Sequence, residues 1–203
     1  MEEILRTWVA PVSSEVFFST FGNHTRLEVK NSGLPIGKFT FLFQKMDQNN
    51  KQTGIIVHYV PIEEALLFAN DILSGGYAKK AMDLKNGSNN IVDVDEFFGS
   101  SKTNEKGEPR ADGKPYFRCM KLSLGNKWML KCSSGPGQKT QTGGVVADGK
   151  PEIQINVGMD NRTLKKMAIM IREEYAAYRT AQYIDHVKKE KVSNLPSFES
   201  FGG

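Results

Sequence analysis

A glycine-rich stretch, CSSGPGQKTQTGG at 132–144, is the part of this sequence that comes nearest to a phosphate-binding loop. A Walker-type loop needs a glycine directly before its lysine, so that backbone amides wrap the phosphates, and a helix directly after it. Here Gln138 separates Gly137 from Lys139, and the residues after Thr140 favour turns and strands. We therefore expect a flexible connection between two strands, with Lys139 near the rim of a surface that contacts polynucleotide phosphates.

Patterns typical of enzymes are not found elsewhere in the sequence. It has no G-x-S-x-G elbow, no H-E-x-x-H pair and no C-x-x-C pair. The carboxylates of Glu63 and Glu64, and of Glu173 and Glu174, are adjacent on predicted helices, where neighbours point in different directions. We expect solvated helix faces rather than acid–base pairs, and a protein that is not an enzyme, although a site formed only by the fold stays open as an alternative.

Cysteine and histidine are too sparse and too scattered for a metal centre. Cys119 and Cys132 both lie in strand-like runs, which predicts buried thiols in a reducing compartment. His24, His58 and His186 lack the spacing of metal ligands. We expect neither a metal nor a cofactor.

The composition is that of a soluble globular protein with a mild basic excess. Of the 203 residues, 39% are hydrophobic and 25% charged, and the formal net charge is +4. This charge permits binding to a polyanion without requiring it. The first residues lack the pattern of a secretory signal, and no apolar run is long enough to span a bilayer. We therefore expect a cytoplasmic protein without membrane contact.

Four strand-like runs fill the first third of the chain. They are rich in aromatic and β-branched residues and are separated by Gly, Asn, Asp or Pro. In KFTFLFQK, Phe39, Phe41 and Phe43 alternate with polar or aliphatic residues and so share one face. After Pro61 the apolar period becomes helical, which predicts an amphipathic helix packed on the preceding sheet. Together these elements form a first unit at 16–82.

The second half repeats this plan after a polar stretch. The polar composition of residues 83–115 predicts a long connection that is anchored by Phe97 and Phe98. Strand-like runs begin again at Tyr116, and the last, EIQINVGM, leads directly into a long helix capped by Asp160 or Asn161. We expect a single α+β domain over 1–203, built from two pseudo-repeated units. Each unit is an antiparallel four-stranded sheet followed by a helix, and the second covers 116–191, before a flexible tail at 192–203.

Basic and aromatic residues interleave along these strands, as a surface for single-stranded nucleic acid requires. In KWMLKCSS, alternation places Lys127, Met129 and Lys131 opposite Trp128 and its inward neighbours. Each aromatic ring taken singly is more simply explained as core. We predict phosphate contacts or base stacking at Lys38, Thr40, Gln44, Lys45, His58, Tyr59, Tyr116, Arg118, Lys121, Lys127, Trp128, Lys131 and Lys139.

The doubled order of four strands and a helix, with EIQINVG passing into MDNRTLKKMAIMI, resembles the fold of the Whirly and positive-cofactor-four families. The resemblance covers roughly residues 16–181. It implies a bacterial or phage relative that binds single-stranded DNA, or RNA, with little sequence preference during replication, recombination or DNA transfer. It also implies self-association. The lysine-glycine-lysine-alanine motif of plant Whirly proteins is absent, so no individual DNA contact is carried over.

Two features favour protein partners instead of, or beside, nucleic acid. The tail at 194–203 is similar in a general way to the peptides with which single-strand-binding proteins recruit partners, and a tail without function is an equal alternative. The long terminal helix carries Tyr175 and Tyr178 on one stripe. The main alternative function is therefore a structural or assembly protein that binds a partner through this helix.

Overall fold

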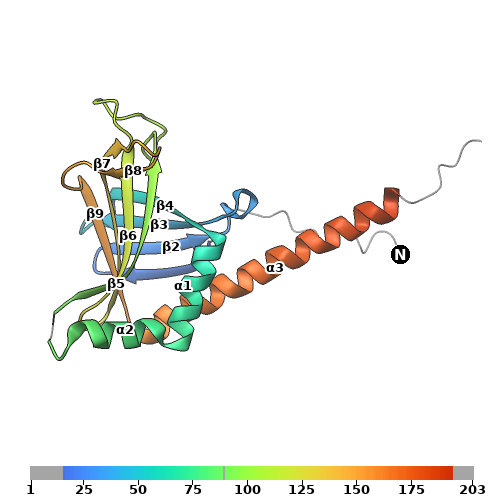
Figure 1. Ribbon diagram of the computed structural model, residues 1–203, viewed down its shortest axis with the longest axis horizontal. Coiled ribbons are helices and arrows are strands. Elements are labelled where there is room, and N and C mark those ends of the chain that lie inside the picture. Colours follow the sequence, from blue (N-terminus) through green and yellow to red (C-terminus); the bar gives the residue numbers. More distant parts are fainter. Residues whose placement is uncertain (1–15, 89, 194–203) are drawn as a thin grey trace, which may run out of the picture.

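The computed structural model describes residues 16–88 and 90–193, which form two antiparallel sheets and three long helices (Figure 1). The first sheet has the order β1-β2-β3-β4. In the second, β6 pairs with β5 and β7, and β7 pairs with β9 along most of its length and with β8 at its end. The strands are β1 (Val16–Gly22), β2 (Thr25–Lys30), β3 (Lys38–Met46), β4 (Gln52–Pro61), β5 (Val92–Ser101), β6 (Tyr116–Leu124), β7 (Trp128–Lys139), β8 (Val145–Ala147) and β9 (Ile153–Met159). The helices are the short η2 (Leu34–Ile36), α1 (Ile62–Ser74), α2 (Gly76–Lys85) and α3 (Asn161–Ser193).

The α+β class and the two antiparallel sheets agree with the sequence prediction, but the sheets pack differently from the expectation. We expected helices to cover the inner face of each sheet. Instead, buried side chains of both sheets belong to one hydrophobic core, and β9 contacts all four strands of the first sheet. In Figure 1 the strands of the second sheet cross those of the first, and the helices gather at one end of this pair of sheets. Each sheet therefore has an inner face in the core and an outer face directed away from it.

The alternation predicted for β3 places three rings in this core. Phe39, Phe41 and Phe43 are fully buried. Phe41 lies opposite Val29 on β2 and His58 on β4, so these two side chains share its inner face. The histidine is thus placed in the core by the same period of two that places the phenylalanines there.

The stretch predicted as a polar connection, 83–115, contains the whole of β5, and this is a correction. The strand is hard to recognise because its register shifts between Asp93 and Asp95, which breaks the alternation of polar and apolar residues. Val94 and Phe97 nevertheless bury their side chains, while Phe98 is 59% exposed. The second sheet therefore has five strands rather than four.

The helices begin where the sequence predicts, and their ends add detail. Gly75, with φ of +81°, ends α1, and a second helix, α2, follows at once where the sequence analysis expected none. Asp160 caps α3, since its Oδ1 accepts the backbone N–H of Thr163 at 2.6 Å. The first turns of α3 bury Leu164 and Met167, and the helix then projects from the body (Figure 1). Among the described residues, no helix is both long and apolar enough to cross a membrane.

Candidate nucleic-acid interface

The outer face of the second sheet combines an aromatic pair with lysines and amides. Residues paired across antiparallel strands point to the same side, so Lys121 on β6, Lys131 on β7 and Asn156 on β9 lie in one row. The rings of Phe98 and Phe117 lie beside this row with centroids 5.9 Å apart. We use "outer face" for the surface formed by Phe98, Phe117, Lys121, Lys127, Lys131, Gln154 and Asn156.

Two of these lysines are partly neutralised by the edge strand β5. Nζ of Lys121 lies 2.9 Å from Glu96 and 3.5 Å from Asp93, and Nζ of Lys131 lies 3.4 Å from Asp93. Burial alone would raise the pKa of the Asp93 carboxyl. The hydrogen bond from Ser123 and the charges of both lysines outweigh this effect, so its pKa lies below the usual range. Positive charge therefore dominates on the β7 and β9 side of the outer face rather than beside β5.

Lys127 adds a cation without an acidic partner on that side. It precedes β7 and is exposed, and no ion pair joins it to any carboxylate in the described ranges. Its side chain lies across Gly158 on β9, where an added Cβ would come within 2.4 Å of the Lys127 Cε. The absence of a side chain at Gly158 thus leaves the room in which Lys127 lies along the outer face.

A small cleft lies along the seam, the line where the edge strands β4 and β5 meet. Its volume is about 140 Å³, and its walls include Lys38, Tyr59, Ser100 and Phe98. Tyr59 is 44% exposed, and Phe98 belongs to the outer face as well. The cleft therefore continues the aromatic surface of the second sheet to the edge of the first.

Buried charged groups close the seam below this cleft. Arg118 donates a hydrogen bond to the Val57 carbonyl at 2.9 Å and forms a 2.8 Å ion pair with Glu105. The same Glu105 carboxylate accepts the Val57 N–H at 3.0 Å, so one side chain from the β5–β6 loop joins an edge of one sheet to the other. Both side chains are largely buried. The arrangement fixes the two edge strands beside each other.

His58 lies in the same region without a hydrogen-bond partner among the described residues. It is 1% exposed, and both ring nitrogens are unpaired. Burial, with a smaller contribution from the nearby Arg118 charge, lowers its pKa to about 4. Gly99 provides its space, because a Cβ there would lie 3.2 Å from the imidazole. His58 is therefore neutral at pH 7.

Four predicted contact residues are not on an accessible face, and for these the prediction is wrong. Thr40 is covered by the turn before β3, where Ser32 donates to its hydroxyl at 3.3 Å. His58 and Arg118 point inward and are buried at the seam. Trp128 also points into the core and is 6% exposed, so it offers no ring for stacking.

The remaining predicted residues divide between the outer face and other places. Lys121, Lys127 and Lys131 share the outer face, and Lys38 and Tyr59 border the seam cleft. Four others lie apart from this group. Gln44 is hydrogen-bonded to Gln52, Tyr116 lies under the guanidinium of Arg110, and Lys45 and Lys139 are exposed at strand ends. His58 lines the cleft from below but, as a buried neutral group, offers no phosphate contact.

Several members of the outer face were not predicted from the sequence. Phe98 was assigned to a hydrophobic anchor, although its neighbour Phe97 alone has that role. Gln154 and Asn156 alternate with buried Ile155 and Val157 in β9, and their amides are hydrogen-bonded at 3.0 Å. The alternation of polar and apolar residues in EIQINVG indicates that Gln154 and Asn156 share a face opposite the core.

Comparison with known proteins identifies no family. No family model matches the chain, and no curated protein matches it in sequence. Among solved structures, the plant transcriptional regulator PBF-2 is similar at 13% sequence identity with a TM-score of 0.42, covering 88% of this chain and 87% of that chain. A similarity of this degree carries no argument about function.

Proposed function

We propose that this protein binds single-stranded nucleic acid across the outer face of the second sheet. The observation that carries the proposal is the aromatic pair of exposed Phe98 and half-buried Phe117 beside Lys121 and Lys131 on one open sheet face. Single-strand binders combine rings on which bases stack with cations that follow the sugar-phosphate chain. In this arrangement Lys127 and Lys131 contact phosphates and the two rings stack on bases.

The seam cleft extends this path. A base that leaves the aromatic pair meets Tyr59, whose ring is also exposed, and Lys38 stands at the cleft to contact the next phosphate. Gln154 and Asn156 offer amide donors and acceptors, which fit either phosphate oxygens or base edges. None of these groups is arranged to select one base, so we propose binding with little sequence preference.

The wider role follows from the resemblance stated from the sequence rather than from this geometry. We propose a non-catalytic role in handling single strands during replication, recombination or DNA transfer, in DNA or in RNA. The predicted partner-binding tail at 194–203 lies outside the described residues.

A titration of labelled single-stranded DNA, double-stranded DNA and single-stranded RNA at several salt concentrations tests the proposal. Fluorescence anisotropy should show tighter binding to single strands than to duplex, with a steep loss of affinity as salt rises. An absence of single-strand binding at low salt would refute the proposal.

Assembly through α3 is a second candidate, and a specific observation favours it. Beyond the core this helix leaves Tyr183 68% and Ile184 47% exposed, and Figure 1 shows this part of it projecting away from both sheets. We propose that this part mediates self-association or contact with a protein partner. Sedimentation equilibrium of the full chain and of a Tyr183→Ser, Ile184→Ser variant should show a larger assembly only for the former, whereas a monomer in both would contradict self-association.

A further inference from the structure

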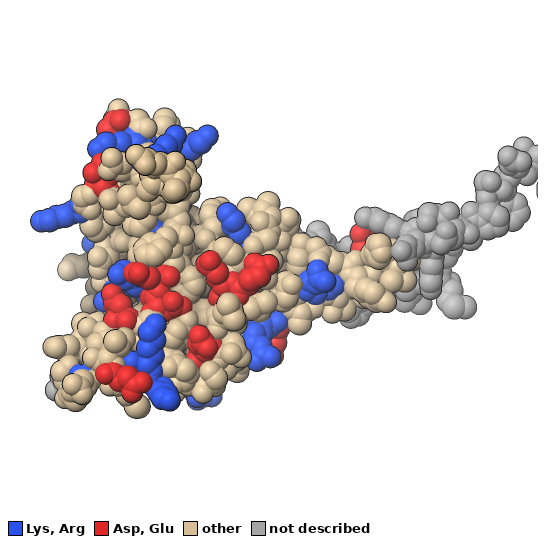
Figure 2. Space-filling view, viewed as in Figure 1, with Lys and Arg blue, Asp and Glu red and all other residues tan. Residues whose placement is uncertain are grey.

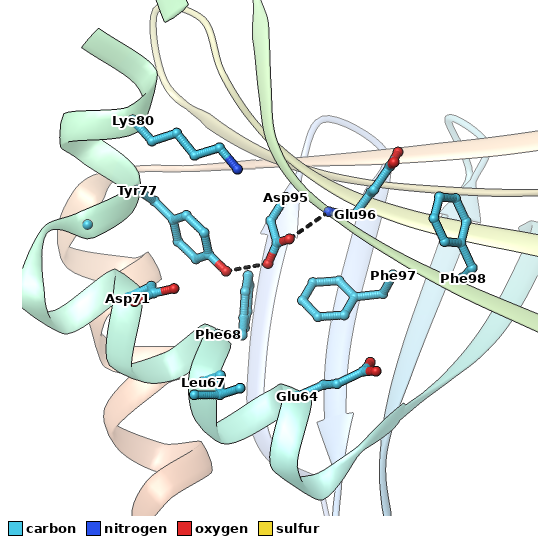
Figure 3. Close-up of a pocket in the computed structure, with 11 residues that line it drawn as sticks. Glu64, Leu67, Phe68, Asp71, Tyr77, Lys80, Asp95, Glu96, Phe97 and Phe98 are labelled. Carbon is cyan, nitrogen blue, oxygen red and sulfur yellow. Dashed lines mark hydrogen bonds between the residues drawn. The ribbon is translucent and has the colours of Figure 1, made fainter. Parts of the chain in front are cut away.

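An open groove of about 610 Å³ lies between α1, α2 and β5, on the helix side of the edge strand (Figure 3). Its base is aromatic. The rings of Phe68 and Phe97 meet edge to face at 5.3 Å, and the ring of Tyr77 lies 5.8 Å from Phe68. These three side chains are buried, while Leu67 at the margin is 66% exposed. The groove thus has a closely packed aromatic base, and Leu67 and Phe98 supply its exposed apolar surface.

Carboxylates surround this apolar base. Glu64 and Asp71 come from α1, and Asp95 and Glu96 from β5, against a single lining cation, Lys80. Figure 2 shows acidic side chains gathered over α1 and the neighbouring part of β5, although the whole chain carries a net charge of +4. The local charge is therefore opposite to that of the molecule.

The position of one carboxylate is fixed from within. The Tyr77 hydroxyl donates a short hydrogen bond to Asp95, as the dashed line in Figure 3 marks. Burial, this hydrogen bond and the charges of Asp95 and Asp71 all raise the pKa of Tyr77, so the phenol keeps its proton. The hydrogen bond thus holds the Asp95 carboxylate beside the rings, whereas Glu64 and Asp71 form no ion pair with any described residue.

We propose that this groove binds a cationic segment of a partner protein in which lysine or arginine side chains alternate with aliphatic ones. The exposed side chains of Leu67 and Phe98 favour apolar side chains, and the carboxylates at the margin favour cations whose stems lie along this apolar surface. Charge complementarity excludes a polynucleotide here, because Glu64, Asp71 and Asp95 would face its phosphates, while Glu96 is paired with Lys121. This site borders the proposed nucleic-acid interface, because Phe98 lines both, but the groove residues Glu64, Leu67 and Asp71 lie on α1.

Three labelled decapeptides test the proposal by anisotropy on the full chain: one alternates lysine with leucine, one lysine with serine and one glutamate with leucine. We expect the lysine–leucine peptide to bind at least fivefold more tightly than either of the others. The double substitution Glu64→Gln, Asp71→Asn should weaken this binding at least fivefold, and so should Leu67→Ser. The matched control Glu63→Gln removes a carboxylate from the same exposed helix outside the groove and should change affinity less than twofold.

Several outcomes would overturn the proposal. One is that the lysine–serine peptide binds as tightly as the lysine–leucine peptide. Another is that the control Glu63→Gln loses as much affinity for the lysine–leucine peptide as the groove variants do. A third is that both groove variants keep the wild-type affinity for this peptide. Displacement of the peptide by spermine at matched charge would identify a polyamine site instead. None of the variants changes Phe98 or Glu96. The affinity of each variant for single-stranded DNA should therefore equal that of the wild type. Loss of peptide binding with intact DNA binding would therefore concern the groove alone.

Discussion

Between pH 6.5 and pH 4 we predict that the protein loses stability through one side chain, the imidazole of His58. Its pKa is about 4 in the folded protein and 6.5 in the unfolded chain. As the pH falls through this window, the unfolded chain binds a proton that the folded protein excludes, so acid favours unfolding. Each pH unit is worth at most about 1.4 kcal/mol. His58 should therefore lower the free energy of unfolding by about 2 kcal/mol between pH 7 and pH 4.5.

Urea denaturation of the wild type and of His58→Leu at pH 7, 6, 5 and 4.5 measures this effect. The leucine has no proton to bind, and comparing each protein with itself across pH cancels any cost of repacking the seam. The wild type should lose about 2 kcal/mol more than the variant by pH 4.5. His24→Asn, an exposed turn histidine with φ of 53° that asparagine tolerates, serves as the control and should follow the wild type. Equal pH dependence in the wild type and His58→Leu would refute the argument for a buried neutral imidazole.

Three further predictions concern the seam and the outer face. Glu105→Ala leaves Arg118 buried without its acidic partner, which should cost about 3 to 5 kcal/mol and lower the melting temperature by roughly 6 to 20 °C. An unchanged melting curve would contradict the role of this ion pair in fixing β4 beside β5. Gly158→Ala should displace Lys127 and weaken single-strand binding as much as Lys127→Ala does, while wild-type affinity would show that Lys127 contacts nothing. If about three lysines contact phosphates, a plot of log affinity against log salt concentration should have a slope of about −2. Lys131→Ala should change this slope to about −1.4. The same slope in both proteins would exclude Lys131 as a phosphate contact.

The sequence predicted the elements with a clear period but not the way in which they pack. Alternation in β3 and β7 correctly placed Phe41 on an inner face and Lys131 on an outer face. For Trp128 the alternation correctly indicated an inner face, whereas the base stacking also predicted for it was wrong. The bulge that interrupts β5 removed the period there, so the strand was taken for a connection and Phe98 was missed.

The buried cations and polar groups were the hardest to predict. Arg118 and His58 look like surface residues in a strand of this composition, and only the crossing of two sheets makes their environment a core. The partner of Arg118, Glu105, comes from a loop that no local pattern links to it. Tertiary contacts of this kind leave no mark in the period of a single strand.

The central claim is that single strands bind on the outer face of the second sheet, and a pair of matched phenylalanines tests it most directly. Phe98 and Phe21 are both exposed strand residues, 59% and 65%, but Phe21 lies on the first sheet. Loss of one stacking ring costs about 1 to 3 kcal/mol. Phe98→Ala should therefore weaken binding to a labelled single-stranded oligonucleotide roughly 5- to 150-fold, and Phe21→Ala should leave it unchanged. Equal affinities for both variants and the wild type would contradict the claim.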